Sequence, residues 1–129
     1  DALSQYGRNL GCAFQLVDDA LDYGAGNSDL GKNIGDDLAE GKPTLPLIHA
    51  LRKAAPADQL IIRRAIEAGG LEDISHIAQT IRNTGALAYT FRKAEEAVDK
   101  AIEALAPLPD SEYKDSLISL ARFTVQRQY

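Results

Sequence analysis

The sequence predicts an all-α protein, and three observations support that fold class. Apolar residues recur at helical spacing from the first residues onward. Glycine and proline interrupt this pattern at intervals, as they do where one helix ends and another begins. No segment shows the alternation of a strand, and no internal repeat is present. A length of 129 residues fits a single domain, so we expect residues 1–129 to belong to one domain.

Composition narrows the function classes. The chain has 19 Asp and Glu against 14 Lys and Arg, which argues against a surface that binds nucleic acid. No apolar run approaches the ~20 residues that span a bilayer, and no secretory signal pattern is seen. The single cysteine, Cys12, cannot form an internal disulfide, which fits a reducing cytosol. We therefore expect a cytoplasmic protein in which Cys12 is a small buried thiol.

The first helix is expected over residues 3–23. Its apolar positions have helical spacing: Leu3, Tyr6, Leu10, Phe14, Val17 and Leu21. The pattern is already running within three residues of Asp1, so we expect the chain to be a piece of a longer protein. Gly7 and Gly11 lie four residues apart on one face, where either a second helix packs closely or a ligand reaches the backbone. We favour helix packing.

Three carboxylates lie at the end of this helix: Asp18, Asp19 and Asp22. The C-terminal end of a helix is the negative end of its dipole, and like charges at i and i+4 repel, so each effect costs a few tenths to about 1 kcal/mol. A bound cation would offset these penalties, and carboxylate ligands suit Mg²⁺ or Ca²⁺. We favour a metal site over a solvated charged face. Gln15 has a similar helical phase and could reach the same cavity.

A glycine-rich stretch over residues 24–43 follows, and it is too long for an ordinary connection between helices. It holds Lys32 and Lys42 among several acids. Lysines opposite a carboxylate cluster indicate a ligand that can interact with the lysines and with the carboxylates at the same time. Diphosphate does so, because a metal ion joins its oxygens to the carboxylates. Plain solvation of the two lysines stays open as the alternative. The stretch matches neither a P-loop nor an EF-hand.

The remaining sequence predicts further helices, over residues 45–54, 57–67, 71–83 and 86–106, and a last one that ends near residue 127. Thr44 is the expected N-cap of the second helix, and Asp110 or Ser111 that of the last. We expect His49 to be a hydrogen-bonded helix residue, and His76 has no assigned role. Several helices carry apolar stripes wide enough to need an additional layer of protein.

The assembled motifs resemble those of the trans-isoprenyl diphosphate synthases. The family's second aspartate-rich motif, together with the residues that usually precede it, matches Gly11-x-x-Phe14-Gln15-x-x-Asp18-Asp19-x-x-Asp22. The stretch that follows it in the bacterial long-chain branch matches Gly31-Lys32 and then Gly35–Pro46. The downstream segment is similar to that of the octaprenyl branch in ubiquinone-making bacteria. The likeness covers the whole chain but corresponds only to the C-terminal part of such an enzyme.

This resemblance implies the helical-bundle fold of isoprenoid synthases and a prenyl transfer reaction. An allylic diphosphate ionises and isopentenyl diphosphate attacks the carbocation, so that repeated cycles build a lipophilic, all-trans polyprenyl diphosphate. By position, Asp18, Asp19 and Asp22 would hold Mg²⁺, with Asp18 as a direct ligand. Asp18 and Lys32 would carry catalysis. The implied substrate-binding residues are Gln15, Lys32, Lys42 and Arg127. The family usually forms homodimers.

Parts of the family pattern are absent from this sequence, namely the first aspartate-rich motif and the Gly-Lys-Arg segment that binds isopentenyl diphosphate. We therefore expect the chain alone to be inactive and the intact protein to be active. Two alternatives stay open. One is a non-catalytic, diphosphate-binding or regulatory subunit of a heteromeric prenyl synthase. The other is a terpene cyclase with the same ionisation chemistry, against which the Gly-Lys and Gly-Asp-Asp-Leu stretches argue.

Overall fold

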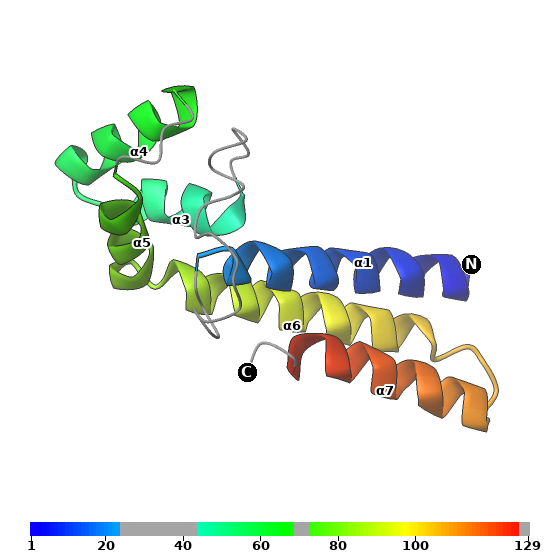
Figure 1. Cartoon of the computed structure of the whole chain (residues 1–129). Helices are drawn as coiled ribbons and strands as arrows, with labels where there is room; N and C mark the ends of the chain where they lie inside the picture. Colours follow the sequence, from blue (N-terminus) through cyan, green and yellow to red (C-terminus); the bar gives the residue numbers. More distant parts are fainter. Residues whose placement is uncertain (24–43, 69–72, 127–129) are drawn as a thin grey trace. The chain divides into compact units, whose positions relative to one another are not determined.

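The computed structural model describes residues 1–23, 44–68 and 73–126, and these ranges form helices without a strand (Figure 1). Six helices lie in them: α1 Ala2–Leu21, α3 Leu45–Lys53, α4 Pro56–Ala68, α5 Ile74–Asn83, α6 Ala86–Ala104 and α7 Glu112–Gln126. The predicted all-α class is confirmed for this part of the chain. None of the helices in the described ranges is long and apolar enough to cross a bilayer.

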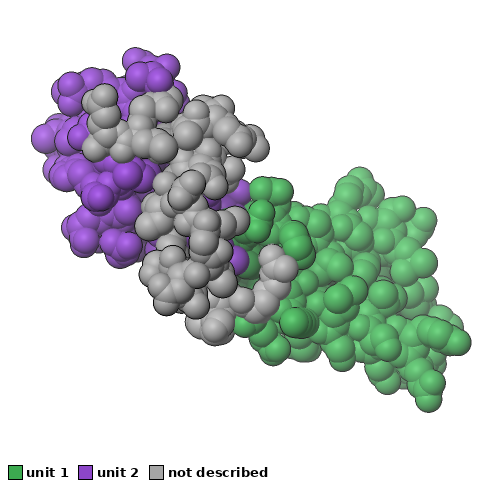
Figure 2. Space-filling model, viewed as in Figure 1, with its two compact units in different colours: residues 1–18, 91–129 green, residues 19–90 purple. Residues whose placement is uncertain are grey.

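The chain divides into two compact units, which Figure 2 shows in different colours. The first unit comprises residues 1–18 and 91–129, and the second comprises residues 19–90. Each unit buries a hydrophobic cluster of its own. The boundary between the units falls at the end of α1, so that Asp18 belongs to the first unit and Asp19 and Asp22 belong to the second.

In the first unit, α7 and residues 91–104 of α6 pack along α1 (Figure 1). Small side chains dominate the contact, which lets the helix axes approach closely. The buried cluster comprises Tyr6, Ala13, Ala97, Val98, Ala101, Leu105 and Ala121. The Tyr6 hydroxyl donates a hydrogen bond to the Leu117 carbonyl at 2.7 Å and so joins α1 to α7. Burial raises the pKa of Tyr6 above its ordinary value, because the phenolate would lose hydration.

In the second unit, α3, α4 and α5 pack against one another. Branched aliphatic side chains and small residues fill the space between them. The buried cluster comprises Tyr23, Leu47, Ala50, Ile62, Ala65, Ile77, Ile81 and Ala86. The Gln59 side-chain amide donates a hydrogen bond to the Leu51 carbonyl at 2.9 Å, which joins α4 to the C-terminal half of α3.

The predicted helix caps are only partly found. The Ser111 hydroxyl accepts a hydrogen bond from the Lys114 backbone N–H at 3.1 Å, so Ser111, and not Asp110, caps α7. Thr44 occupies the N-cap position of α3 as expected, but its side chain makes no capping hydrogen bond. The start of α3 is instead favoured by Pro46, whose ring fixes a helical φ and whose missing N–H has no helical partner to lose.

The turn between α5 and α6 depends on a glycine. Gly85 has a φ of +73°, which side chains with a Cβ rarely adopt. Its N–H donates to the Arg82 carbonyl at 3.1 Å, and its own carbonyl accepts from the Tyr89 N–H at 3.0 Å. The residue therefore ends one helix and begins the next, as the sequence pattern predicts for this position.

Two expectations about α1 are not met. Cys12 is exposed, whereas a buried thiol was predicted, because the core is formed by another face of the helix that carries Tyr6 and Ala13. The close helix packing expected at Gly7 and Gly11 does not occur in the described chain either. A Cβ added at either glycine would meet no atom within 4 Å. This side of α1 is therefore open.

Candidate functional site

The three candidate metal ligands lie at the end of α1. Asp18 and Asp19 are in its last turn, and Asp22 directly follows the helix. That turn contains no basic residue that could complement the helix dipole. The chain turns at once, since the Tyr23 N–H donates to the Ala20 carbonyl at 3.2 Å. The expected position of the carboxylates at the negative end of the helix is thus confirmed, although the helix ends slightly earlier than predicted.

Burial distinguishes the three carboxylates from one another. Asp19 and Asp22 are only 7% and 4% exposed, and Asp18 is partly exposed. The alternative of a solvated charged face is therefore excluded for Asp19 and Asp22. A carboxylate held away from water responds strongly to a second charge placed near it, because the effective dielectric constant is low. Asp18 is the member of the cluster that a ligand from solvent can reach most readily.

A magnesium ion fits the donor chemistry of these residues. All three side chains offer hard oxygen ligands, which Mg²⁺ prefers. Within the described ranges, no three His, Cys, Asp or Glu side chains come close enough together to hold a metal ion by themselves. Mg²⁺ usually keeps several waters and binds through one or two carboxylates plus substrate phosphates, so it does not need such a cage. The arrangement suits a metal ion that arrives with a phosphate group.

The other predicted site residues are only partly described by the structure. Gln15 lies on α1 one turn before Asp18 and is exposed. Lys32 and Lys42 lie within residues 24–43, and Arg127 begins the stretch 127–129, all outside the described residues. The lysine side of the site therefore stays a prediction from the sequence.

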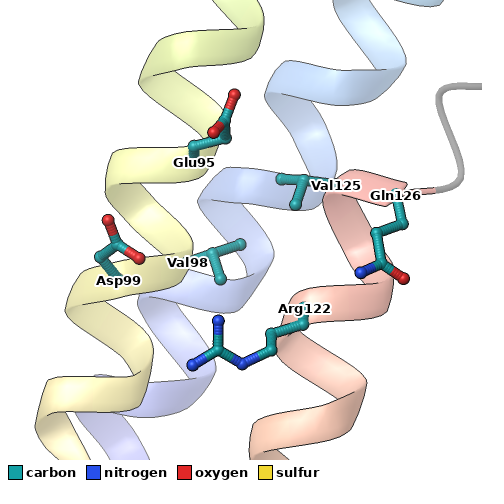
Figure 3. Close-up of a pocket in the computed structure, with 6 residues that line it drawn as sticks. All are labelled: Glu95, Val98, Asp99, Arg122, Val125 and Gln126. Carbon is teal, nitrogen blue, oxygen red and sulfur yellow. The ribbon is translucent and has the colours of Figure 1, made fainter.

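A separate hollow of about 140 Å³ lies between α6 and α7 in the first unit (Figure 3). Its lining is formed by Glu95, Val98, Asp99, Arg122, Val125 and Gln126. Figure 3 shows Arg122 extending from α7 toward α6, whose two carboxylates line the other side. The sequence analysis predicts no site at any of these residues. The hollow holds none of the predicted site residues, and mixed charges of this kind do not select for diphosphate.

The two histidines contact other side chains of the second unit. His49 stacks on Tyr89 with ring centroids 4.1 Å apart, which joins α3 to α6. His76 Nε2 lies 2.6 Å from Asp58 Oδ1, which joins α5 to α4. The contact described for His49 is thus a ring stack between helices, and the hydrogen bond expected for its side chain stays a prediction. The His76 contact was not foreseen, because nothing in the sequence places these two helices side by side.

Comparison with known proteins identifies the family. Residues 1–84 match the family model described as polyprenyl synthetase. The chain belongs to this family. It is 53% identical over 129 residues to the octaprenyl diphosphate synthase of Haemophilus influenzae, and 51% identical over 126 residues to that of Escherichia coli. These matches cover 99% and 97% of the chain but 39% of each relative, so this polyprenyl synthetase sequence spans about two fifths of the curated relatives' length.

Solved structures of polyprenyl synthases have the same fold over the matched region. The polyprenyl synthase of Caulobacter crescentus, complexed with calcium and isoprenyl diphosphate, matches with a TM-score of 0.87 and 44% identity. A decaprenyl diphosphate synthase from Rhodobacter capsulatus matches with a TM-score of 0.89 and 41% identity. Each match covers 99% of this chain and 40% of the other. The resemblance stated from the motifs and the isoprenoid synthase fold are thereby confirmed.

Proposed function

We propose that this chain carries the second aspartate-rich motif of a prenyltransferase that condenses isopentenyl diphosphate with an allylic diphosphate. The product would be a long-chain, all-trans polyprenyl diphosphate. An octaprenyl chain, used for ubiquinone, is supported by the names of the two bacterial relatives. The observation that carries the proposal is the cluster of three acids at the end of α1, in a chain of the polyprenyl synthetase family.

The acids would act at the diphosphate end of the allylic substrate. Asp18, Asp19 and Asp22 would hold Mg²⁺, which when bound neutralises charge on the departing diphosphate. Asp18 would be the direct ligand, and its partial exposure supports that role. The two buried acids would contact the metal directly or through water. Gln15, exposed one turn earlier on α1, would line the same cavity.

The lysines would supply positive charge to the same leaving group. Lys32 and Lys42 would each place an ammonium group beside phosphate oxygens, as lysine does in other phosphate sites. A fixed positive charge lowers the barrier because negative charge develops on the diphosphate as the allylic bond breaks. Arg127 would lie toward the isopentenyl diphosphate end. The isoprenyl diphosphate bound to the Caulobacter crescentus synthase supports this ligand class.

Variants of a full-length synthase that carries this sequence test the assignment. The readout is incorporation of labelled isopentenyl diphosphate into polyprenyl product. We expect Asp18→Ala and Lys32→Ala each to lower kcat by about 10²- to 10³-fold, as when one group that stabilises transition-state charge is lost. Glu103→Ala and Lys100→Ala, at exposed positions of α6, are the matched controls and should leave turnover unchanged. Normal turnover in Asp18→Ala or Lys32→Ala would refute the site.

A second candidate is a non-catalytic subunit that binds diphosphate within a heteromeric prenyl synthase. This candidate stays open beside the synthase, and the 129 residues hold one DDxxD motif. Intact-mass analysis of the native protein separates the two. A polypeptide of 13.9 kDa that copurifies with a second synthase subunit would support the subunit. A single polypeptide of the relatives' full length that makes polyprenyl diphosphate would support the synthase, and analysis of that product excludes a cyclase.

We further propose that the full-length protein is a cytoplasmic homodimer and that residues 1–129 belong to one catalytic domain. The family resemblance supports the dimer, and the single cysteine is compatible with a reducing compartment. The acid excess argues against a surface that binds nucleic acid. Sedimentation equilibrium of the full-length protein tests the dimer, because a monomeric mass at micromolar concentration would contradict it.

A further inference from the structure

A basic surface lies where α3 and α4 follow one another in the second unit. Arg52 and Lys53 lie in the last turn of α3, and both are exposed. Arg63 and Arg64 lie about two turns into α4 and are also exposed. Leu60, one turn before them on the same side of α4, is 56% exposed. We call these five residues the α3–α4 basic surface.

A hydrogen bond brings the two helices together beside this surface. The Gln59 side-chain amide donates to the Leu51 carbonyl at 2.9 Å. Arg52 directly follows Leu51 in the chain, and Leu60 directly follows Gln59. Arg63 lies one turn beyond Gln59 along α4. The cations of the two helices therefore belong to one region of the second unit.

Interactions within the described ranges do not account for all four cations. The ion pairs found there involve other residues. Arg52 and Lys53 complement the negative end of the α3 dipole. Arg63 and Arg64 lie in the middle of α4, before its last turn, so the dipole of α4 does not favour them. Of the two acids of α4, the exposed Glu67 alone shares their side of the helix.

The charge of this surface contrasts with that of the remaining chain. Residues 44–68 carry four cations and two acids, which gives a net charge of +2, whereas the whole chain has −5. The rest of the sequence therefore carries −7 (−5 − 2). Exposed charges further apart than the Debye length, ~8 Å at physiological salt, are largely screened from one another. An anionic surface that approaches α3 and α4 therefore responds mainly to the cations there.

We propose that the α3–α4 basic surface docks the synthase on an anionic phospholipid bilayer. Each Lys or Arg close to such a bilayer strengthens binding about fivefold, and an exposed leucine can enter the headgroup region. A bilayer is the fitting anionic partner because the polyprenyl product is lipophilic and has to reach a membrane after synthesis. The choice of partner therefore rests on the proposed function, whereas the surface itself does not.

Co-sedimentation of a full-length synthase that carries this sequence with lipid vesicles tests the proposal. Vesicles of phosphatidylcholine alone are compared with vesicles of equal parts phosphatidylcholine and phosphatidylglycerol, and the readout is the partition coefficient of the protein. We expect the wild type to sediment with the anionic vesicles only, and added salt to release it. Arg63→Gln combined with Arg64→Gln should lower the partition coefficient at least tenfold, since each charge contributes about fivefold. Leu60→Gln should lower it as well.

A control pair removes the same charge elsewhere. Arg8→Gln combined with Lys100→Gln, at exposed positions of α1 and α6, should leave binding unchanged, and circular dichroism checks that every variant is folded. The proposal is overturned if the wild type does not sediment with anionic vesicles, or if the arginine pair and the control pair have the same effect. Binding of a DNA duplex through the same arginines, without vesicle binding, would also overturn it. Vesicle binding by a protein that forms no labelled polyprenyl product would support docking and count against the proposed function.

Discussion

At the scale of single residues, Asp18 is placed where its charge opposes the helix that carries it. It lies in the last turn of α1, at the negative end of the dipole, and no base in that turn compensates. Asp19 shares this position and is buried as well. Residues that weaken the free protein are expected where a ligand restores the balance, since stability and function compete at binding sites.

The first prediction follows from this placement. Asp18→Asn should raise the free energy of unfolding of the 129-residue chain by about 0.3–1 kcal/mol, because the unfavourable dipole interaction is removed. Urea unfolding followed by circular dichroism measures it. Glu112→Gln is the matched control, since Glu112 lies in the first turn of α7 and should lose a similar amount. A less stable Asp18→Asn variant would show that the Asp18 carboxylate stabilises the fold, and its assignment to a binding site would then be wrong.

At the scale of helices, two glycines with similar free space should respond in opposite ways to the same substitution. Gly85→Ala should destabilise the chain by about 1 kcal/mol, because a φ of +73° strains any residue with a Cβ. Gly11→Ala should stabilise it by about 0.5–1 kcal/mol, because Gly11 is inside α1 and the new methyl group meets no neighbour. Thermal unfolding of both variants measures this, and a shift of the same sign in both would contradict it.

The contact between α1 and α7 gives a prediction with a pH dependence. Tyr6→Phe removes the 2.7 Å hydrogen bond to the Leu117 carbonyl and should cost about 0.5–1.5 kcal/mol at neutral pH. Because burial raises the pKa of Tyr6 in the folded chain, its stabilising effect is complete below the unfolded pKa of about 10 and is lost as the pH rises through the folded value.

The Tyr6→Phe chain should therefore lose less stability than the wild type between neutral pH and a pH above 10, in urea titrations at each pH. Tyr113→Phe, at an exposed position of the same pair of helices, should change neither the stability nor its pH dependence. Identical pH profiles for Tyr6→Phe and the wild type would mean that the hydroxyl of Tyr6 is not held by this contact.

At the scale of the whole molecule, the helices were predictable because local signals determine where they end. Pro56 and Gly85 mark helix boundaries in the sequence and in the structure alike. The acids attract attention in the sequence because three carboxylates at the C-terminal end of a helix oppose its dipole, and the family match agrees with the motif they form. The spacing of residues along the sequence therefore predicts which kind of element forms and which residues in it are unusual.

The sequence pattern did not predict which helices pack against one another. Tyr6 and Leu117 are 111 residues apart, and no pattern in either helix points to the other. The pair of His76 and Asp58 likewise depends on how α4 and α5 cross. The apolar residues of α1 span a wide arc, so periodicity alone could not decide which part of that arc is covered, and Cys12 was placed wrongly for this reason. The lysines of the proposed site lie outside the described residues.

The exposed position of Cys12 has a practical consequence for anyone who handles the purified chain. It is the single thiol in the sequence, so air oxidation can link two copies but never three. Electrophoresis without reductant should then show a band of twice the monomer mass that dithiothreitol removes. The same thiol offers one attachment point for a spin label or a fluorophore, at a position where the probe displaces no core side chain.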